Sequence, residues 1–357
     1  MYRYFIELVQ IFNQLGAWQK RGLALWCCGV LLAESCQISR VADALLAEKK
    51  GSVGAISKRL SRFLGNPRIN DEAMTRVWIE WIVSRYNQQQ WSILVDETKL
   101  SNHVSVMMVG LAYRGRAIPL LWRCYHPKKY PVEGQVQMIA DLLRRLQLIV
   151  PDTIHMTIMA DRGIGTSPDL IRYLEQAGLD YLLRVQRSCH IQLSNGDTIP
   201  LKQLVKYGEC WQGQGNVFKK AGWIACYVRI EWRLGEKDLW CLVTNCPLRT
   251  TSDYAQRAWH EHSFRDLKSF GFNWQASQVW QPERLQRLLM ILAITYTWVL
   301  SQAVLYTPEE RISPSRTAPR ESLFRRGLRW IRQLKVTPQP HQVYPDFYFC
   351  PDTPLLC

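Results

Sequence analysis

A run without a single charged side chain, from Leu288 to Tyr306, is the feature that most constrains the fold of this chain. A helix of that length can cross a bilayer. The run nevertheless contains Thr295, Ser301 and Gln302, and no second apolar span accompanies it. We therefore expect this run to form the buried helix of a large protein core.

The charge balance predicts a polyanionic partner. The chain has 357 residues, with 45 Lys and Arg against 30 Asp and Glu, which gives a formal net charge of +15. Such an excess is typical of proteins that bind nucleic acid or an anionic membrane. A basic protein without such a partner is the alternative. The hydrophobic content of 47% is that of a globular protein, and the length allows two or three domains.

The cysteines indicate the compartment. The chain has 11 Cys, an odd number, and no CxxC motif occurs. This pattern fits neither a zinc framework nor a secreted disulfide scaffold. The N-terminus also lacks the pattern of a signal peptide. We therefore expect a reducing, cytoplasmic location.

The segment 1–88 is expected to be a helical, DNA-binding domain. Two helical patterns, Ile38–Lys49 and Val53–Leu64, resemble a helix pair with a basic second helix. Such a pair is compatible with a helix-turn-helix reader of DNA, although a plain helical bundle fits equally well. The DNA-binding candidates on the second helix are Lys58, Arg59 and Arg62.

From Trp91 onward, strands and helices alternate, which predicts a mixed α/β core beginning with residues 89–187. A strand over Ser92–Val95 is expected to end at Asp96, and one over His155–Ala160 at Asp161. The Arg114-Gly115 pair predicts a turn between two further strands. Helices are expected over Gln135–Leu148 and Ser167–Ala177.

Three further segments complete the expected organisation. Residues 188–238 read as a β-rich insertion, because an Asn195-Gly196 pair between apolar runs is a strong hairpin signal. Residues 239–306 return to the core with its catalytic helix, and 307–357 form a basic helical tail. The DNA-binding candidates in the tail are Arg325, Arg326 and Arg329.

A polar stripe marks the helix that begins near Tyr254. At about 100° per residue, its members fall within an arc of roughly 60°. The stripe consists of Tyr254, Arg257, Glu261 and Lys268. The opposite, apolar side is expected to carry Trp259, Leu267 and Phe270. An ordinary solvated face with ion pairs four residues apart is the alternative interpretation.

Carboxylates at three separate places suggest a metal site. Side chains at the ends of adjacent strands converge in open α/β sheets, so Asp96 and Asp161 are expected to meet. Together with Glu261 they would repel one another unless divalent cations are bound, and Mg²⁺ prefers oxygen ligands. Two Mg²⁺ ions, or Mn²⁺ in their place, can activate a hydroxyl and stabilise the leaving oxygen of a phosphodiester. Arg257 and Lys268 would then hold the phosphate.

This spacing resembles the DDE transposases of bacterial insertion sequences, specifically the family named after insertion sequence 4. The family signature is Tyr, two residues, Arg, three residues, Glu, six residues, Lys, and it matches here from Tyr254 to Lys268 without a gap. The runs LVDET and MADRGIG resemble its two aspartate motifs, and SKRLSRFL and SLFRRGLRWI its terminal motifs. A weak departure is Ile164, where a larger apolar or aromatic residue often follows the DRG triplet.

The resemblance, which covers residues from about 57 to 335, implies an RNase H-like fold with a β insertion between the second Asp and the Glu. It implies Mg²⁺-dependent cut-and-paste transposition of DNA through a hairpin at the transposon end, in a bacterial, nucleoid-associated protein. It also implies that Tyr254 contacts the DNA end and that the chain forms a homodimer in the synaptic complex.

Two other functions fit the same residues. One is an inactive, DNA-binding inhibitor of transposition, and the other is a nuclease that cuts without strand transfer. A zinc protease is excluded, because the segment from His260 to His262 is not HExxH. Within the transposase interpretation, a hairpin requires a base to leave the duplex stack and to find an aromatic surface. The candidates in or beside the insertion, which packing alone would also explain, are Trp211, Trp223, Trp232 and Trp240.

Overall fold

The computed structural model describes residues 1–46, 51–306, 321–336 and 347–349. Its N-terminal part is helical, as predicted. The helices there are α1 (Tyr2–Leu8), η1 (Val9–Ile11), α2 (Ala17–Ala33), α3 (Ile38–Ala44), α4 (Val53–Leu64) and α5 (Asp71–Arg85). The predicted bounds of α4 are confirmed. The helix expected over Ile38–Lys49 is shorter, and the end of that range lies outside the described residues.

Side-chain caps explain where two of these helices begin. The Ser52 hydroxyl accepts a hydrogen bond from the backbone N–H of Ala55 at 3.2 Å, at the start of α4. The Asn70 side chain accepts one from Ala73 at 3.0 Å, at the start of α5. Each cap satisfies a backbone donor that has no partner within the helix.

One mixed sheet extends from the strand that begins at Gln90 to the strand that ends at Thr244. Its strand order is β3-β2-β1-β4-β5-β10-β9-β8-β6-β7. β1 pairs in parallel with β4, β4 pairs in parallel with β5, and the other pairs are antiparallel. The strands are β1 (Gln90–Leu100), β2 (Val104–Tyr113), β3 (Arg116–Tyr125), β4 (His155–Ala160), β5 (Asp180–Arg184), β6 (His190–Gln192), β7 (Thr198–Pro200), β8 (Cys210–Val217), β9 (Ile224–Glu231) and β10 (Trp240–Thr244). The predicted mixed α/β, RNase H-like class is confirmed.

The local turn signals were read correctly. Arg114 and Gly115 have φ angles of 44° and 82°, as a two-residue hairpin turn between β2 and β3 requires. The Asn195-Gly196 pair joins β6 to β7, which are antiparallel neighbours.

The end of the first strand was predicted wrongly. Asp96 was expected to follow the strand, but β1 continues through it to Leu100. The reason is that β1 has two partners. Its parallel pairing with β4 ends at Val95, whereas its antiparallel pairing with β2 extends to Leu100.

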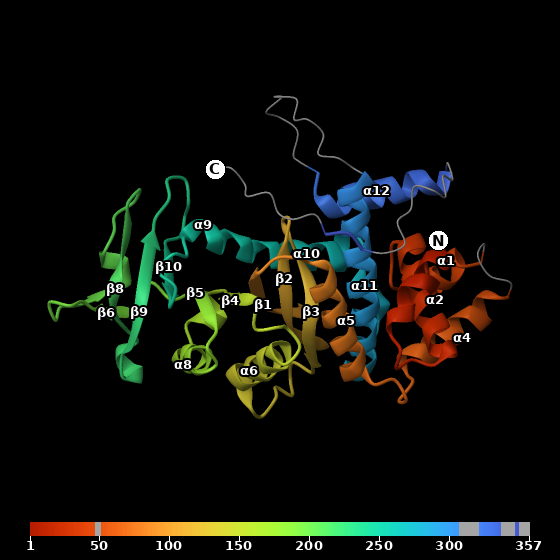
Figure 1. Cartoon of the computed structure of the whole chain (residues 1–357), viewed down its shortest axis with the longest axis horizontal. Coiled ribbons are helices and arrows are strands. Elements are labelled where there is room, and N and C mark those ends of the chain that lie inside the picture. The colour runs from red at the N-terminus through yellow and green to blue at the C-terminus, as the bar shows by residue number, and fades with distance from the viewer. Residues whose placement is uncertain (47–50, 307–320, 337–346, 350–357) are drawn as a thin grey trace, which may run out of the picture.

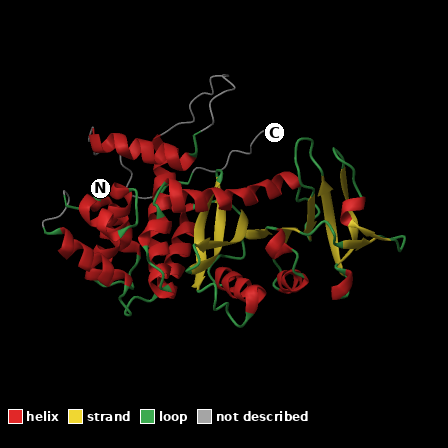
Figure 2. Cartoon of the chain, turned by 180° about the vertical axis from the view of Figure 1, so that it is seen from behind, coloured by secondary structure: helices red, strands yellow, loops and turns green. Residues whose placement is uncertain are grey.

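Helices cover both faces of the core sheet (Figure 1). α6 (Gly134–Gln147) and α8 (Pro168–Gln176) lie on one face, while α9 (Thr251–Tyr254) and α10 (Ala258–Arg265) cross the other. A small separate core fills the space under α9 and α10. It consists of Leu94, Ala112, Ala117, Met159, Leu182, Leu242 and Tyr254. In Figure 2 the N-terminal helices and the insertion strands lie at opposite ends of the molecule.

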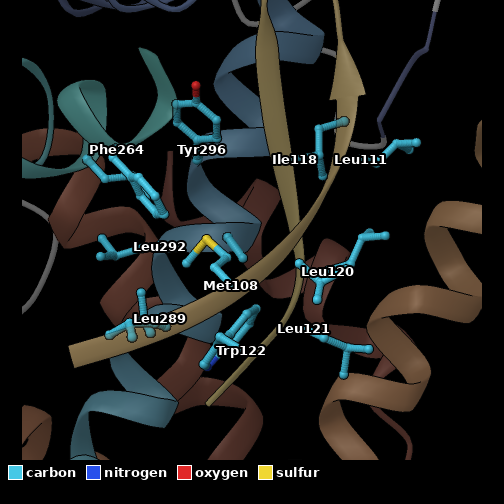
Figure 3. Packing of buried hydrophobic residues seen from close by; sticks show 14 of the residues in the cluster. Met108, Leu111, Ile118, Leu120, Leu121, Trp122, Phe264, Leu289, Leu292 and Tyr296 are labelled. Atoms are coloured by element: carbon cyan, nitrogen blue, oxygen red, sulfur yellow. The ribbon is translucent and has the colours of Figure 1, made fainter. Parts of the chain in front are cut away.

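The uncharged run forms most of α11 (Pro282–Tyr306), and the prediction of a buried core helix is confirmed. By length and composition α11 is a possible membrane span within the described chain, but 89% of its most apolar window is buried in the protein. It lies between the β3 side of the sheet and the N-terminal helices. Figure 3 shows Leu289 and Leu292 of α11 beside Met108 and Trp122 of the sheet.

A helix of the C-terminal tail, α12 (Leu323–Val336), packs on α11, and a helical tail was predicted. It buries four apolar side chains, those of Leu323, Phe324, Leu328 and Ile331. Gly327 lies at the closest approach of α12 to α11. A Cβ atom there would be 2.5 Å from the carbonyl oxygen of Val299.

Gly327→Ala should therefore destabilise the protein. A methyl group cannot fit against a backbone oxygen, so α12 must shift, and we expect a loss of about 1–3 kcal/mol in the free energy of unfolding. Urea denaturation measures it. Gly54→Ala in α4 is the matched control, because the nearest atom to its Cβ is 4.0 Å away. The control should be neutral or stabilising by up to about 1 kcal/mol. Equal stability of the two variants would contradict the packing argument.

Candidate active site

The three carboxylates predicted to act together surround one guanidinium. Nη2 of Arg257 lies 3.2 Å from Oδ2 of Asp96 and 3.4 Å from Oδ2 of Asp161. Nη1 of Arg257 donates to Oε1 of Glu261. Residues far apart in the sequence thus meet at one point.

The sheet holds the two aspartates side by side. Asp96 follows Val95, which pairs with Ala160, the residue before Asp161. Oδ1 of Asp96 accepts from the N–H of Glu97 at 2.9 Å, and Oδ1 of Asp161 accepts from the N–H of Gly163 at 2.9 Å. In both residues one oxygen is therefore fixed by the backbone. The other oxygen, Oδ2, points toward Arg257.

Glu97 is next to Asp96 in sequence, but its side chain lies on the other face of the sheet. Alternation along β1 turns its side chain toward the opposite face, where it interacts with Tyr125. Burial raises the pKa of the Tyr125 phenol, and the Glu97 carboxylate raises it further. His260 is 1% exposed, and burial lowers its pKa to about 3.

The helix carrying Glu261 is not the single α-helix that was expected. It consists of α9, a 3-10 turn η4 (Ala255–Arg257), α10 and a π-turn η5 (Asp266–Phe270). The predicted faces are wrong at both ends. Tyr254 is 4% exposed, whereas Phe270 is 52% exposed.

Tertiary contacts explain both departures. The Tyr254 hydroxyl donates to the carbonyl of Ala160 at 3.2 Å, and its ring packs edge-on against Trp240 at 5.4 Å. Phe270, turned outward by the π-turn, lies under the guanidinium of Arg325 at 5.1 Å. Contact of Tyr254 with DNA stays a prediction, and its ring lies below the surface.

A buried polar network fixes the π-turn. Nε of Arg116 donates to Oδ2 of Asp266 at 2.5 Å, and the hydroxyl of Tyr296 donates to the same oxygen at 3.2 Å. Ser263 accepts from the backbone N–H of Ala117 at 2.7 Å. These bonds join α10 and the π-turn to β3 and α11. π-turns occur often at functional sites, where they redirect side chains.

Lys268 lies in this π-turn, and its side chain reaches the end of β1. Its Nζ donates to the carbonyl of Lys99 at 2.9 Å. Burial lowers the pKa of Lys268, while the nearby charge of Asp96 opposes that shift. Lys268, the second predicted phosphate-binding cation, is therefore held against the end of β1, the strand that carries Asp96.

Burial and neighbouring charges shift the pKa of Asp96. Burial raises its pKa from 3.8 to about 6, Arg257 opposes the rise, and Asp161 and Glu261 add to it by charge repulsion. A donor set made only of carboxylate oxygens suits Mg²⁺. Within the described residues no three His, Cys, Asp or Glu side chains are yet arranged to share an ion. The guanidinium of Arg257 lies between the carboxylates instead.

A cavity of about 390 Å³ adjoins Asp161. Of the four tryptophan candidates, Trp240 lines it, and Trp211, Trp223 and Trp232 do not. The remaining lining residues are Arg162, Gly163, Arg184, Tyr254, Ala255, Arg257 and Ala258.

Sequence reasoning missed two cations of this cavity. Arg162 follows Asp161 directly, and Arg184 ends β5, the strand beside β4. The available signals were the position of Arg162 directly after Asp161 and the position of Arg184 at the end of an apolar strand. Asp238 pairs with both, at 3.4 Å and 2.7 Å respectively.

The remaining basic candidates lie on α4 and α12. Lys58, Arg59 and Arg62 are exposed on α4. On α12, Arg325 and Arg329 are exposed, and Arg326 is half-buried. Their contact with DNA stays a prediction.

One comparison with known proteins bears on this geometry. Residues 132–298 match the family described as the transposase DDE domain. The matched segment contains Asp161, Arg257, Glu261 and Lys268, while Asp96 precedes it. The match indicates a transposase or nuclease enzyme. No curated protein matches the chain.

The raised pKa of Asp96 predicts a pH-dependent effect of Asp96→Asn on stability in metal-free buffer. Because the folded state binds this proton more tightly than the unfolded state, the wild type loses stability as the pH rises from about 4 to about 6. The Asp96→Asn variant has no ionisable group at this position and does not lose this stability. We expect it to be more stable than the wild type by about 1–3 kcal/mol at a pH near 8.

The difference should shrink as the pH falls from about 6 and disappear below about 4, where both side chains are neutral. Urea unfolding in the presence of EDTA across this range measures it. Glu97→Gln, on the other face of β1, is the control and should not show this profile. An Asp96→Asn variant that is less stable than the wild type at neutral pH would contradict the assignment.

Proposed function

We propose that this protein is a Mg²⁺-dependent DNA transposase that cleaves transposon ends and joins them to target DNA. The observation that carries the proposal is the convergence of Asp96, Asp161 and Glu261 on one point beside Arg257 and Lys268. The similarity of residues 132–298 to the transposase DDE domain supports it. Membership in the insertion sequence 4 branch is part of the proposal.

Each carboxylate has an oxygen suited to a metal ion. Asp96 and Asp161 would use Oδ2, since their Oδ1 atoms are held by backbone N–H groups. Glu261 has a side chain that is 55% exposed and can turn toward the same point. Bound Mg²⁺ would supply activation of the attacking hydroxyl and stabilisation of the leaving oxygen.

Arg257 has two roles in this mechanism. Without a bound cation it neutralises the carboxylates. With their charge offset by metal, its guanidinium can instead donate to the non-bridging oxygens of the scissile phosphate. Lys268, held at the same site by the π-turn, would add a second positive charge as negative charge develops in the transition state.

The partners follow from this chemistry. The substrate would be double-stranded DNA, at the transposon ends and at the target, and the +15 net charge favours its binding. Two copies of the chain would hold two ends together. The expected location is the cytoplasm of a bacterium, on the nucleoid.

A nuclease without strand transfer and an inactive DNA-binding inhibitor are the competing functions. The intact carboxylates argue against the inhibitor. Incubating the protein and Mg²⁺ with linear DNA that carries the ends of its element, together with a target plasmid, separates the three. Joined products support the transposase, cut ends alone indicate the nuclease, and bound but uncut DNA indicates the inhibitor.

The three carboxylates should act as a unit. We expect Asp96→Asn, Asp161→Asn and Glu261→Gln each to reduce cleavage by about a thousandfold or more, since a two-metal site fails without any one ligand. Binding of end DNA should persist, because the basic surface is untouched. A gel shift and a cleavage assay on the same preparation test this. Glu97→Gln is the matched control and should cleave normally. Full cleavage by any of the three variants would remove that residue from the site.

Trp240 is the best placed of the aromatic candidates to receive a base displaced at a DNA hairpin. It lines the cavity beside Asp161, and the guanidinium of Arg233 covers its ring at 4.9 Å. Trp232 packs edge-on against Tyr207 at 5.6 Å instead. A base leaving the stack next to the cut would meet Trp240 first.

Trp240→Ala should spare the first nick and slow hairpin formation by about tenfold, because stacking of a base on an aromatic ring contributes about 1–3 kcal/mol. The two steps are followed separately on denaturing gels. Trp232→Ala is the control and should form hairpins at the wild-type rate, after circular dichroism has shown both variants to be folded. Unimpaired hairpin formation in Trp240→Ala would show that this ring does not hold the base.

A further inference from the structure

A second cavity, of about 540 Å³, lies between the N-terminal helices and the segment that enters α11. One wall comes from the start of α3 and from Ser61 of α4. The other comes from the end of η6 (Trp274–Ser277) and the residues that follow it. We call this cavity the Gln–Ser groove, and the lining residues used below are Gln37, Ser39, Ser61, Trp280, Gln281 and Arg284.

The groove is rich in hydrogen-bond donors and has no carboxylate among its lining residues. Nη2 of Arg284 donates to the hydroxyl and the carbonyl of Ser61, at 2.8 Å and 3.1 Å. Nε of Arg284 is buried without a hydrogen-bond partner among the described residues. Amides, hydroxyls and one guanidinium without an opposing acid form a surface that suits phosphate oxygens.

One wall of the groove contacts the turn that follows β1. Trp280 stacks on His103 with ring centroids 4.6 Å apart. His103 lies in the turn after β1, and Lys99 near the end of β1 accepts the hydrogen bond from Lys268. Trp280 of the groove therefore contacts the turn after β1, the strand that carries Asp96 and Lys99.

We propose that the Gln–Ser groove binds the sugar–phosphate backbone of duplex DNA that extends from the active site toward α4. This inference rests on the proposed function and adds a contact surface to it. Backbone contacts of this kind position a duplex without reading its sequence. An acidic protein would bind best to a surface with several positive charges. The groove instead has one arginine surrounded by neutral hydrogen-bond donors, and this arrangement suits the closely spaced oxygens of phosphate groups.

Gln281→Glu tests the groove with little change in shape. Gln281 is exposed, and the substitution introduces a negative charge where the lining has none. With a fluorescein-labelled linear duplex of arbitrary sequence, we expect about 5- to 10-fold weaker binding at low salt by fluorescence anisotropy. The difference should vanish at high salt, where charges are screened.

Gln176→Glu is the matched control. Gln176 is an exposed residue of α8, on the face of the sheet opposite α10, so the same change in net charge should leave the affinity unchanged. Ser39→Asp, on the other wall of the groove, should repeat the loss if Gln281→Glu does not fold. Equal affinities of the wild type and both groove variants would overturn the inference. An equal loss in the control would overturn it too, since net charge alone would then explain the effect.

The outcome is separable from the test of the proposed function. Binding to an arbitrary duplex does not require cleavage, so a wild type that binds but fails to cut with Mg²⁺ refutes the transposase mechanism and leaves the groove measurable. A wild type that cuts normally, with groove variants that bind like the wild type, refutes only the groove.

Discussion

Repulsion among Asp96, Asp161 and Glu261 is the constraint on which the arrangement of this site depends. Two carboxylates are fixed side by side by parallel strands, and the third comes from a helix on one face of the sheet. Burial and mutual repulsion raise the pKa of Asp96 to about 6, so the cluster needs a positive charge to stay ionised. Arg257 supplies that charge here. In the proposed reaction, metal ions would take over this function and release Arg257 for the phosphate.

The position of the third carboxylate depends on packing far from it. α10 is joined to β3 through Ala117 and Ser263, and the following π-turn is held by Arg116, Asp266 and Tyr296. Tyr296 belongs to α11, whose long uncharged surface is buried between the sheet and the N-terminal helices. Burial of α11 in the core therefore also fixes the position of Tyr296, which belongs to the polar network. That network also holds the π-turn from which Lys268 reaches the end of β1.

Local sequence patterns predicted the features that depend mainly on neighbouring residues. Paired turn residues identified the hairpins, the uncharged run identified α11, and apolar strands before Asp96 and Asp161 placed both acids together, although β1 runs on past Asp96. Helical periodicity failed around Tyr254, because bonds to Ala160 and Trp240 bury the phenol and Asp266 imposes a π-turn. No sequence pattern encodes these partners, since each comes from a distant segment. Pairing of β5 with β10, which places the strand after the insertion in the core sheet, was hidden for the same reason.

That pairing matters for the proposed chemistry. Had β10 belonged to a separate body on a linker, Trp240 would move independently of the carboxylates. Instead, β10 is hydrogen-bonded to β5, and β5 to β4, whose end carries Asp161. Trp240 and Asp161 therefore line the same cavity as parts of one continuous sheet. A base stacked on Trp240 would hold its own phosphate at a fixed distance from the carboxylates, and this kind of positioning lowers the barrier to an in-line attack.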